Sequence, residues 1–284
     1  MPATVRFDAG LEALVRGDWR TVAEGLGFTE GPLWHPDGYL LFSDQHGRIC
    51  RMDDGEVETY QALPGQAPNG LTWDLEGRLL VCFQDARYVG REENGEVRPL
   101  VTHYEGKRFN SPNDIIVRSD GRIYFTDPPY GLKSDDEREL PYNGVFTLSP
   151  AGELRLLLDD FDRPNGLAFS PDEQTLYIAD TARHHVRTFA VAEDGALTDE
   201  GIFAETREEG RPDGLKVDRD GRVFVCAGSL QVFDAAGKAL GVIDCAQSPA
   251  NCAWGEDGGT LFVCARTSVY ALAFDTVGIA PYLR

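Results

Sequence analysis

The sequence predicts an all-β fold, a six-bladed β-propeller built from four-stranded blades. A pattern of one polar residue, a short apolar-alternating run, a turn and a second apolar run occurs six times along the 284 residues. The copies are separated by roughly 40 to 50 residues, which is the period of a propeller blade. A third observation is the extended segment 20–24, which precedes the first copy and has no blade of its own.

Each of the six copies predicts a β-hairpin. The copies are EGPLWHPDGYLLFSD from Glu30, NGLTWDLEGRLLVCF from Asn69, NDIIVRSDGRIYFTD from Asn113, NGLAFSPDEQTLYIAD from Asn165, DGLKVDRDGRVFVCA from Asp213 and the weaker ANCAWGEDGGTLFVCA from Ala250. Turns such as Asp120-Gly121 tolerate the positive φ angles of tight hairpins. The second run is strongly apolar, so we expect a strand covered on both faces. Further strands, for example at 144–148 and 153–158, would complete four strands per blade.

The segment 20–24 (RTVAE) is expected to close the ring. We predict that it pairs as the outer strand of the last blade, because this removes an exposed sheet edge. No linker or shift in composition marks a second domain. Residues 1–284 are therefore expected to form a single propeller domain.

Composition and charge argue against several function classes. The net charge is −20, which disfavours nucleic acid and anionic membranes as partners because phosphates would be repelled. No apolar run of transmembrane length and no signal peptide are apparent, which favours a cytoplasmic location. The six cysteines form no C-x-x-C pair, so a thiolate zinc site has no support. We expect a monomer or weak homo-oligomer acting on a small molecule.

The first residues of the six copies form a set that we call the column residues. They are Glu30, Asn69, Asn113, Asn165, Asp213 and Ala250. The first strand of each blade lines the central channel of a propeller, so these side chains would converge at one mouth. The two carboxylates would repel each other there unless a cation bound between them.

A divalent cation is the interpretation that we favour for the column. Ca²⁺ suits an irregular, all-oxygen ligand set best, and Zn²⁺, Mn²⁺, Mg²⁺ and Fe²⁺ remain alternatives. The simpler interpretation is that Asn-Gly and Asp-Gly only turn the chain into each first strand. Glu30-Gly31 argues against it, because Glu is not a favoured turn residue.

The loops that follow the second strands should reach the same mouth. They are residues 43–46, 84–85, 127–130 and 180–183, and the segment 108–110 arrives there too. His184 and His185 are adjacent on a strand and therefore point to opposite faces, so we expect packing or surface roles for them. The role of His46 stays open.

Several motifs in combination resemble the gluconolactonase / senescence marker protein / luciferin-regenerating family. They are RFNSPNDIIV, FTDPPYGL, ELPYNGVF, RPNGLAFSPD and RPDGLKVD, and the resemblance extends from residue 28 to residue 264. It implies a six-bladed propeller and a metal site. The metal-binding positions that it implies are Glu30, Asn113, Asn165 and Asp213.

The resemblance also implies roles for single residues. Asp213 matches the residue assigned as general base, and Asn69 matches a residue that contacts either the substrate or the side chains around it. We further expect Arg108 and Tyr130 to hold hydroxyls or a carboxylate of the substrate.

The function implied is that of a lactonase. The ion would polarise the carbonyl of a small lactone, a sugar-acid lactone as in gluconolactonases, and Asp213 would assist the attack of water. A phosphotriesterase-like hydrolase, using the same ion on a P=O group, is one alternative. A non-catalytic binding propeller with a structural metal is another.

Overall fold

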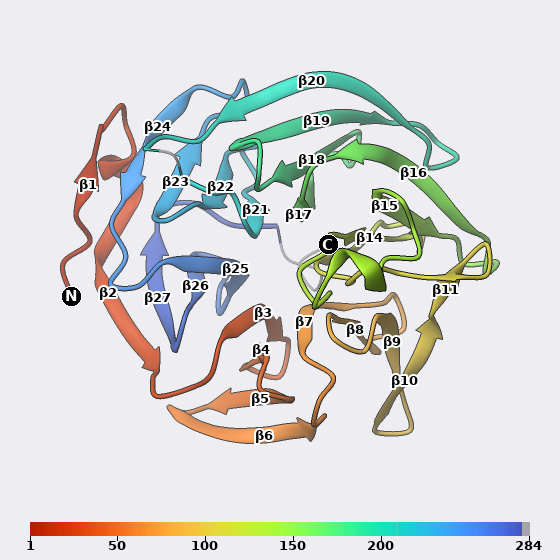
Figure 1. Ribbon diagram of the computed structural model, residues 1–284. Coiled ribbons are helices and arrows are strands. Elements are labelled where there is room, and N and C mark those ends of the chain that lie inside the picture. The colour runs from red at the N-terminus through yellow and green to blue at the C-terminus, as the bar shows by residue number, and fades with distance from the viewer. Residues whose placement is uncertain (209, 280–284) are drawn as a thin grey trace.

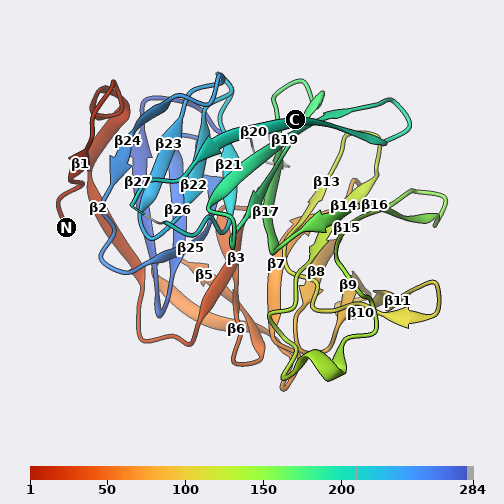
Figure 2. The same ribbon diagram turned by 45° about the horizontal axis from the view of Figure 1, so that its top comes forward.

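The computed structural model describes residues 1–208 and 210–279. Six antiparallel sheets are arranged around a central axis, as Figure 1 shows from one mouth and Figure 2 from a tilted direction. Each innermost strand contacts the innermost strand of the next blade, and these contacts run around the complete ring. The predicted six-bladed, four-stranded architecture is confirmed.

The blades are numbered I to VI in chain order, and their strands are given from the axis outwards. Blade I contains β3 (Thr29–His35), β4 (Tyr39–Asp44), β5 (Arg48–Asp53) and β6 (Glu56–Ala62); blade II contains β7 (Pro68–Trp73), β8 (Leu79–Phe83), β9 (Tyr88–Glu93) and β10 (Glu96–Val101); blade III contains β13 (Ile115–Val117), β14 (Ile123–Asp127), β15 (Asn143–Leu148) and β16 (Leu154–Phe161). Blade IV contains β17 (Pro164–Phe169), β18 (Thr175–Asp180), β19 (His185–Val191) and β20 (Leu197–Glu205); blade V contains β21 (Leu215–Val217), β22 (Val223–Cys226), β23 (Leu230–Phe233) and β24 (Ala239–Ile243); blade VI contains β25 (Pro249–Gly255), β26 (Thr260–Ala265), β27 (Ser268–Phe274) and β2 (Val15–Ala23).

The N-terminal strand β2 closes the ring, as the sequence predicted. It pairs antiparallel with β27, with Arg20 opposite Ala271 and Thr21 opposite Tyr270. The strand is longer than the segment 20–24 and ends at Ala23. In Figure 1 this strand, in red, lies beside the blue strands of blade VI.

A second N-terminal strand was not predicted. The two residues of β1 (Val5–Arg6) pair with β24 and make blade V five-stranded, with Val5 opposite Ile243. Between β1 and β2, Leu11 is fully buried against the core of blades V and VI. The N-terminal segment therefore covers the outer edges of two adjacent blades.

The core lies between neighbouring blades. The second strands are buried along most of their length, and all five residues of β8 are buried. Between blades II and III, Phe109, Phe125 and Phe146 pack in mutual contact, with ring centroids 5.2–5.3 Å apart. Such sheet-on-sheet packing buries the apolar runs that the repeat predicted.

The remaining short elements lie outside the blades. They are the two-stranded ribbon of β11 (His103–Tyr104) and β12 (Lys107–Arg108) and the 3₁₀ turns η1 (Glu12–Leu14) and η2 (Asp135–Glu137). Within the described ranges, no helix has the length and apolar character needed to span a membrane.

Candidate active site

The backbone places the column residues in a ring. The carbonyl oxygen of every column residue accepts a hydrogen bond from the preceding blade. The donors are Cys264 Sγ to Glu30 (3.6 Å), Ser43 Oγ to Asn69 (2.6 Å), Gly70 N to Asn113 (2.8 Å), Thr126 Oγ1 to Asn165 (2.9 Å), Gly166 N to Asp213 (3.1 Å) and Gly214 N to Ala250 (2.7 Å). One contact of this kind at each interface between blades fixes the height of each column residue along the axis.

The innermost strands are irregular at the same place. In blades I, II, IV and VI the pairing of the first and second strands shifts register at or beside the column residue. A bulge re-aims a side chain relative to the regular alternation of a strand. This irregularity allows a polar side chain to face the axis while the apolar residues that follow it enter the core.

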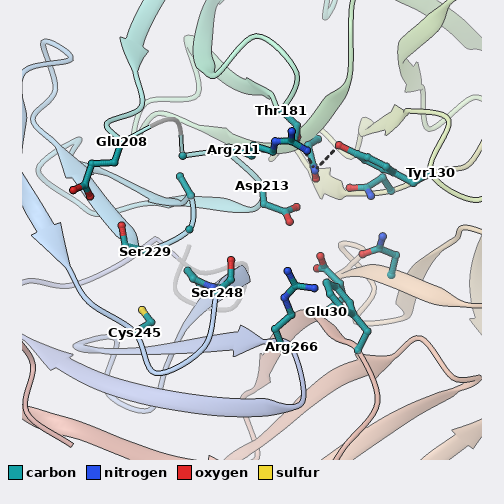
Figure 3. A pocket seen from close by; sticks show the side chains of 18 of the residues that line it. Glu30, Tyr130, Thr181, Glu208, Arg211, Asp213, Ser229, Cys245, Ser248 and Arg266 are labelled. Carbon is teal, nitrogen blue, oxygen red and sulfur yellow. Dashed lines mark hydrogen bonds between the residues drawn. The ribbon is translucent and has the colours of Figure 1, made fainter.

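Five of the six column residues line one cavity of about 720 Å³ at the mouth of the channel. They are Glu30, Asn69, Asn113, Asn165 and Asp213. Figure 3 shows Glu30 extending into this cavity from β3 and Asp213 from the segment that precedes β21. The convergence that the repeat alignment predicts is therefore present.

The two column carboxylates, Glu30 and Asp213, are electrostatically unfavourable in the chain alone. Glu30 is 3% exposed, and burial raises its pKa to about 7, with a further contribution from the negative charge of Asp114. Burial, followed by repulsion from Glu30 and Asp114, raises the pKa of Asp213 well above its ordinary value. Three acidic groups near one axis favour a bound cation at the mouth.

The amide of Asn165 has a defined orientation. Its Nδ2 donates to Thr181 Oγ1 at 3.0 Å and to Tyr130 Oη at 3.3 Å. Thr181 in turn donates its own proton to the carbonyl oxygen of Pro212 at 2.6 Å, so its oxygen is fixed as the acceptor. The amide nitrogen of Asn165 is thereby held by its neighbours, and its oxygen is left for a ligand.

The amide of Asn69 is also oriented through its nitrogen, here by the loop that follows β8. Its Nδ2 donates to Gln84 Oε1 at 2.8 Å, and Gln84 also accepts from Gln45 Nε2 at 3.4 Å. Asn69 Oδ1 is buried and has no hydrogen-bond partner among the residues that the structure describes. An unpartnered buried acceptor is costly, so this oxygen is suited to a ligand that supplies a proton or a positive charge.

The sixth blade also contributes a polar side chain, which the sequence alignment missed. The column residue there is Ala250, but the side chain of the next residue, Asn251, interacts with Glu30 and lowers its pKa. Asn251 occupies the position that is glycine in four of the other copies. The sequence contained a sign of this contribution, because in the sixth copy a polar residue follows the column position. Asp114 occupies the same position in blade III and acts on both cavity carboxylates.

A buried aspartate positions the segment that leads to Asn113. The carboxylate of Asp127 accepts hydrogen bonds from the backbone N–H groups of Asn110 at 2.7 Å and Ser111 at 2.6 Å. Asp127 is fully buried, and this burial raises its pKa to about 7. The turn 110–113 is therefore held by the end of β14.

The loops after the second strands reach the cavity, as the sequence predicted. Gln45, Gln84, Tyr130 and Thr181 come from four such loops, and all four line it. No histidine lines it within the described ranges. His184 Nδ1 forms a hydrogen bond with the carbonyl oxygen of Gly210 at 3.1 Å.

Arg108 does not lie in this cavity. It belongs to β12 and lines a separate depression with residues such as Asp85 and Lys133. Its backbone N–H donates to Glu139, and its guanidinium lies 3.4 Å from the carbonyl oxygen of Ala86. The structure therefore does not bring Arg108 together with the column residues, because it lies on the ribbon β11–β12 outside the cavity.

The residue types at the mouth fit a hard divalent cation. Across the described residues, no three His, Cys, Asp or Glu side chains converge as a metal site. The oxygen donors that the column residues bring to the mouth are two carboxylates and three amides. Carboxylate and amide oxygens are the donors that Ca²⁺ and similar cations prefer. The raised pKa values of Glu30 and Asp213 and the orientation of Asn165 are consistent with such an ion.

Comparison with known proteins assigns the chain to a family. The sequence model of the "SMP-30/Gluconolactonase/LRE-like region" matches residues 28–267. The gluconolactonase of Zymomonas mobilis is 35% identical over 305 aligned residues, which cover 96% of this chain and 85% of that protein. The pentonolactonase XacC of Haloferax volcanii is 29% identical over 239 aligned residues, which cover 79% of this chain and 76% of that protein.

A solved structure agrees with the sequence comparisons. The gluconolactonase from Xanthomonas campestris is 35% identical and superimposes with a TM-score of 0.88, covering 96% of this chain and 95% of that one. Fold, matched region and sequence identity lead to the same assignment. The chain belongs to the SMP-30/gluconolactonase/LRE-like family.

Proposed function

We propose that this chain is a metal-dependent lactonase that opens the ester ring of a sugar-acid lactone. The observation that carries the proposal is the ring of column residues, which brings two carboxylates and three amides to one cavity. Two relatives that align with most of the chain are named gluconolactonase and pentonolactonase, which supports the same reaction.

The divalent cation would be held by Glu30, Asn113, Asn165 and Asp213. Glu30 and Asp213 supply the negative charge, and the two amides supply neutral oxygens. An ion bound there polarises the ester carbonyl and stabilises negative charge on its oxygen. The all-oxygen set favours Ca²⁺, and Mg²⁺ and Mn²⁺ suit it better than Zn²⁺ or Fe²⁺ do.

Asp213 is the proposed general base. It accepts a proton from the water that attacks the carbonyl carbon, and it returns this proton to the ring oxygen as the C–O bond breaks. As a ligand of the cation, Asp213 would have a lowered pKa and be a weak base, so the ion would have to help activate the water. Water is thereby added across the ester bond, and the product is the open hydroxy acid.

Two further residues are suited to bind the substrate. Asn69 Oδ1 is an acceptor without a partner in the described part of the chain and would accept a hydrogen bond from a sugar hydroxyl. Tyr130 keeps its phenolic proton, because burial raises its pKa to about 12, so its hydroxyl remains a donor. The several hydroxyls of a sugar-acid lactone match this polar lining.

The proposal is tested by hydrolysis of a panel of lactones. Chelated protein would be assayed with a pH indicator, alone and with Ca²⁺, Mn²⁺ or Zn²⁺ added back, and a phosphate triester would be included. We expect metal-dependent turnover of a sugar lactone. If no lactone is hydrolysed while added metal strongly raises Tm, the chain is instead a binding propeller. Turnover of the triester alone would identify a phosphotriesterase.

Asp213→Asn tests the role of the base. The amide keeps an oxygen ligand but cannot accept the proton, so we expect kcat to fall about 10²- to 10⁴-fold at saturating metal with an unchanged Tm. Asp85→Asn is the matched control, because Asp85 is exposed on the same face and lies outside the cavity. Full activity of Asp213→Asn would exclude Asp213 as the base.

A further inference from the structure

Two arginine side chains extend into the cavity beside the proposed metal site. Arg211 lies in the loop between β20 and β21, and Arg266 lies in the turn between β26 and β27. Figure 3 shows both side chains directed toward the space that Glu30 and Asp213 face. Neither guanidinium forms a hydrogen bond or ion pair with the residues described, although Arg266 lies 5.8 Å from the ring centroid of Phe28.

The other two arginines of the cavity have partners. Arg6 is paired with Glu208 at 2.8 Å and with Asp244 at 2.7 Å. The guanidinium of Arg207 lies 5.3 Å from the ring centroid of Phe7. Arg207 and Arg266 each lie against an aromatic ring, but the ring beside Arg207 is Phe7 of the N-terminal segment. Arg211 and Arg266 are the two that Figure 3 shows facing the column carboxylates.

The charge balance makes these two arginines unusual. The chain contains 47 acidic and only 27 basic residues, so most basic side chains have an acid within reach. Four carboxylates line the cavity, and a divalent cation would offset Glu30 and Asp213. Arg6, which pairs with both Glu208 and Asp244, and Arg207 together offset the other two. The positive charges of Arg211 and Arg266 would then remain unbalanced. Two such groups in one cavity match a carboxylate or phosphate, which arginine binds through paired N–H donors.

We propose that the substrate is a lactone that carries a second, anionic group, a carboxylate or a phosphate, and that Arg211 and Arg266 bind this group. The inference rests on the proposed lactonase function and narrows its substrate class. The cavity of about 720 Å³ has the size of a small-molecule site and contains both the arginines and the column residues. The ester would face Asp213 while the anionic group contacts the arginines.

The test compares three lactones of one ring structure. They are glucono-1,5-lactone, which is neutral, its 6-phosphate, and the analogue with a carboxylate at carbon 6. We expect wild-type kcat/KM to be higher for at least one anionic lactone than for the neutral one. Arg211→Gln and Arg266→Gln should each lower kcat/KM for that lactone about tenfold or more. Arg211→Gln should leave the neutral lactone nearly unchanged, whereas Arg266→Gln should lower kcat/KM less for the neutral lactone than for the anionic one, because Arg266 also lowers the pKa of Asp213. The anionic lactone whose kcat/KM falls more in these variants shows whether the site binds a carboxylate or a phosphate.

The matched control is Arg219→Gln. Arg219 is exposed in the β21–β22 turn and lies outside the cavity, so this variant makes the same change in net charge without changing the site. Arg266→Lys keeps the charge but loses the paired donors, and it should recover part of the lost kcat/KM. A wild-type preference for the neutral lactone would overturn the inference. An equal loss for neutral and anionic lactones would do so as well, because it would place the arginines at the reacting ester.

A binding measurement separates this inference from the proposed function. Calorimetric titration with glucarate, an open-chain dicarboxylate, requires no turnover. The double variant Arg211→Gln/Arg266→Gln should bind glucarate at least about tenfold more weakly than wild type. Equal binding would overturn the anion site even in an active lactonase. Hydrolysis of no lactone at all would overturn the proposed function, whatever the titration shows.

Discussion

Asn165 and Asn69 show how single side chains are prepared for a ligand. In each residue the amide nitrogen donates to an oxygen of a neighbouring loop, Thr181 for Asn165 and Gln84 for Asn69. An amide whose nitrogen is occupied presents its oxygen to the remaining space. The orientation is therefore set before a ligand arrives, and this lowers the entropy lost on binding.

Thr181→Val should weaken cation binding without abolishing catalysis. The valine has nearly the same shape but cannot accept from Asn165 Nδ2, so the amide loses its orientation. Residues that orient metal ligands typically contribute 10- to 100-fold in affinity, so we expect the cation concentration for half-maximal activity to rise about tenfold. Metal titration of activity measures this, and saturating metal should restore most of kcat.

Thr175→Val is the control for that substitution. Thr175 begins β18, at the end of the strand away from Asp180 and the loop that carries Thr181. An unchanged half-maximal cation concentration in Thr181→Val would show that Thr181 does not orient Asn165.

At the scale of elements, the innermost strands carry the site because their column residues are bonded across every interface between blades. Where glycine follows the column residue, the neighbouring backbone can approach closely. A Cβ at Gly166 would lie 2.4 Å from the carbonyl oxygen of Asp213 and 2.6 Å from the Cα of Gly214. The glycine of one blade therefore determines the position of the base in the next blade.

Gly166→Ala should reduce both stability and turnover. The methyl group would displace the backbone at Asp213, and overpacking of this kind costs about 1–3 kcal/mol or more. Gly152→Ala is the control, because a Cβ there has no atom within 4 Å, although φ is +84°. We expect the control to lose up to about 2 kcal/mol from its positive φ while keeping full turnover. Urea unfolding and lactone assays measure both properties, and an active, stable Gly166→Ala would contradict the coupling between blades.

For the whole molecule, closure of the ring depends on the N-terminal strand. Strand β2 is held by pairing with β27 and by Trp19, which is 4% exposed. Trp19 Nε1 donates to the carbonyl oxygen of Asp244 at 2.9 Å, and its ring packs edge-on against Tyr270. One side chain of the closing strand therefore connects blade VI to the end of blade V.

Trp19→Ala should destabilise the entire propeller. Removal of a buried tryptophan typically costs about 3–5 kcal/mol, and here it also loosens the strand that covers the edge of β27. Arg16→Ala on the same strand is the control, because its ion pair with Asp275 is exposed and contributes at most about 1 kcal/mol. Equilibrium unfolding in urea compares the two variants. Similar losses would show that closure does not depend on the Trp19 contacts.

Much of the fold could be predicted from the sequence, because a repeated pattern indicates both the single strands and the number of blades. Alternation of apolar residues predicted the strands, and six copies at a blade-like spacing predicted the ring and its closure by residues 20–24. The same alignment predicted that Glu30, Asn113 and Asp213 would meet. Strand β1 was missed, because two residues are too few to show a periodicity.

The sequence by itself determined which residues stand at the mouth of the channel, because their position depends only on the repeat. The tertiary structure decided how they are held and what surrounds them. The contact of Asn165 with Thr181 depends on a loop of the same blade, and that of Glu30 with Asn251 depends on the first strand of blade VI. The outward path of Arg108 depends on the ribbon β11–β12. Loop conformation is set by contacts between residues distant in the chain, which no local pattern contains. For this reason the charge of the cavity wall, and with it the inferred substrate class, became visible only in the folded molecule.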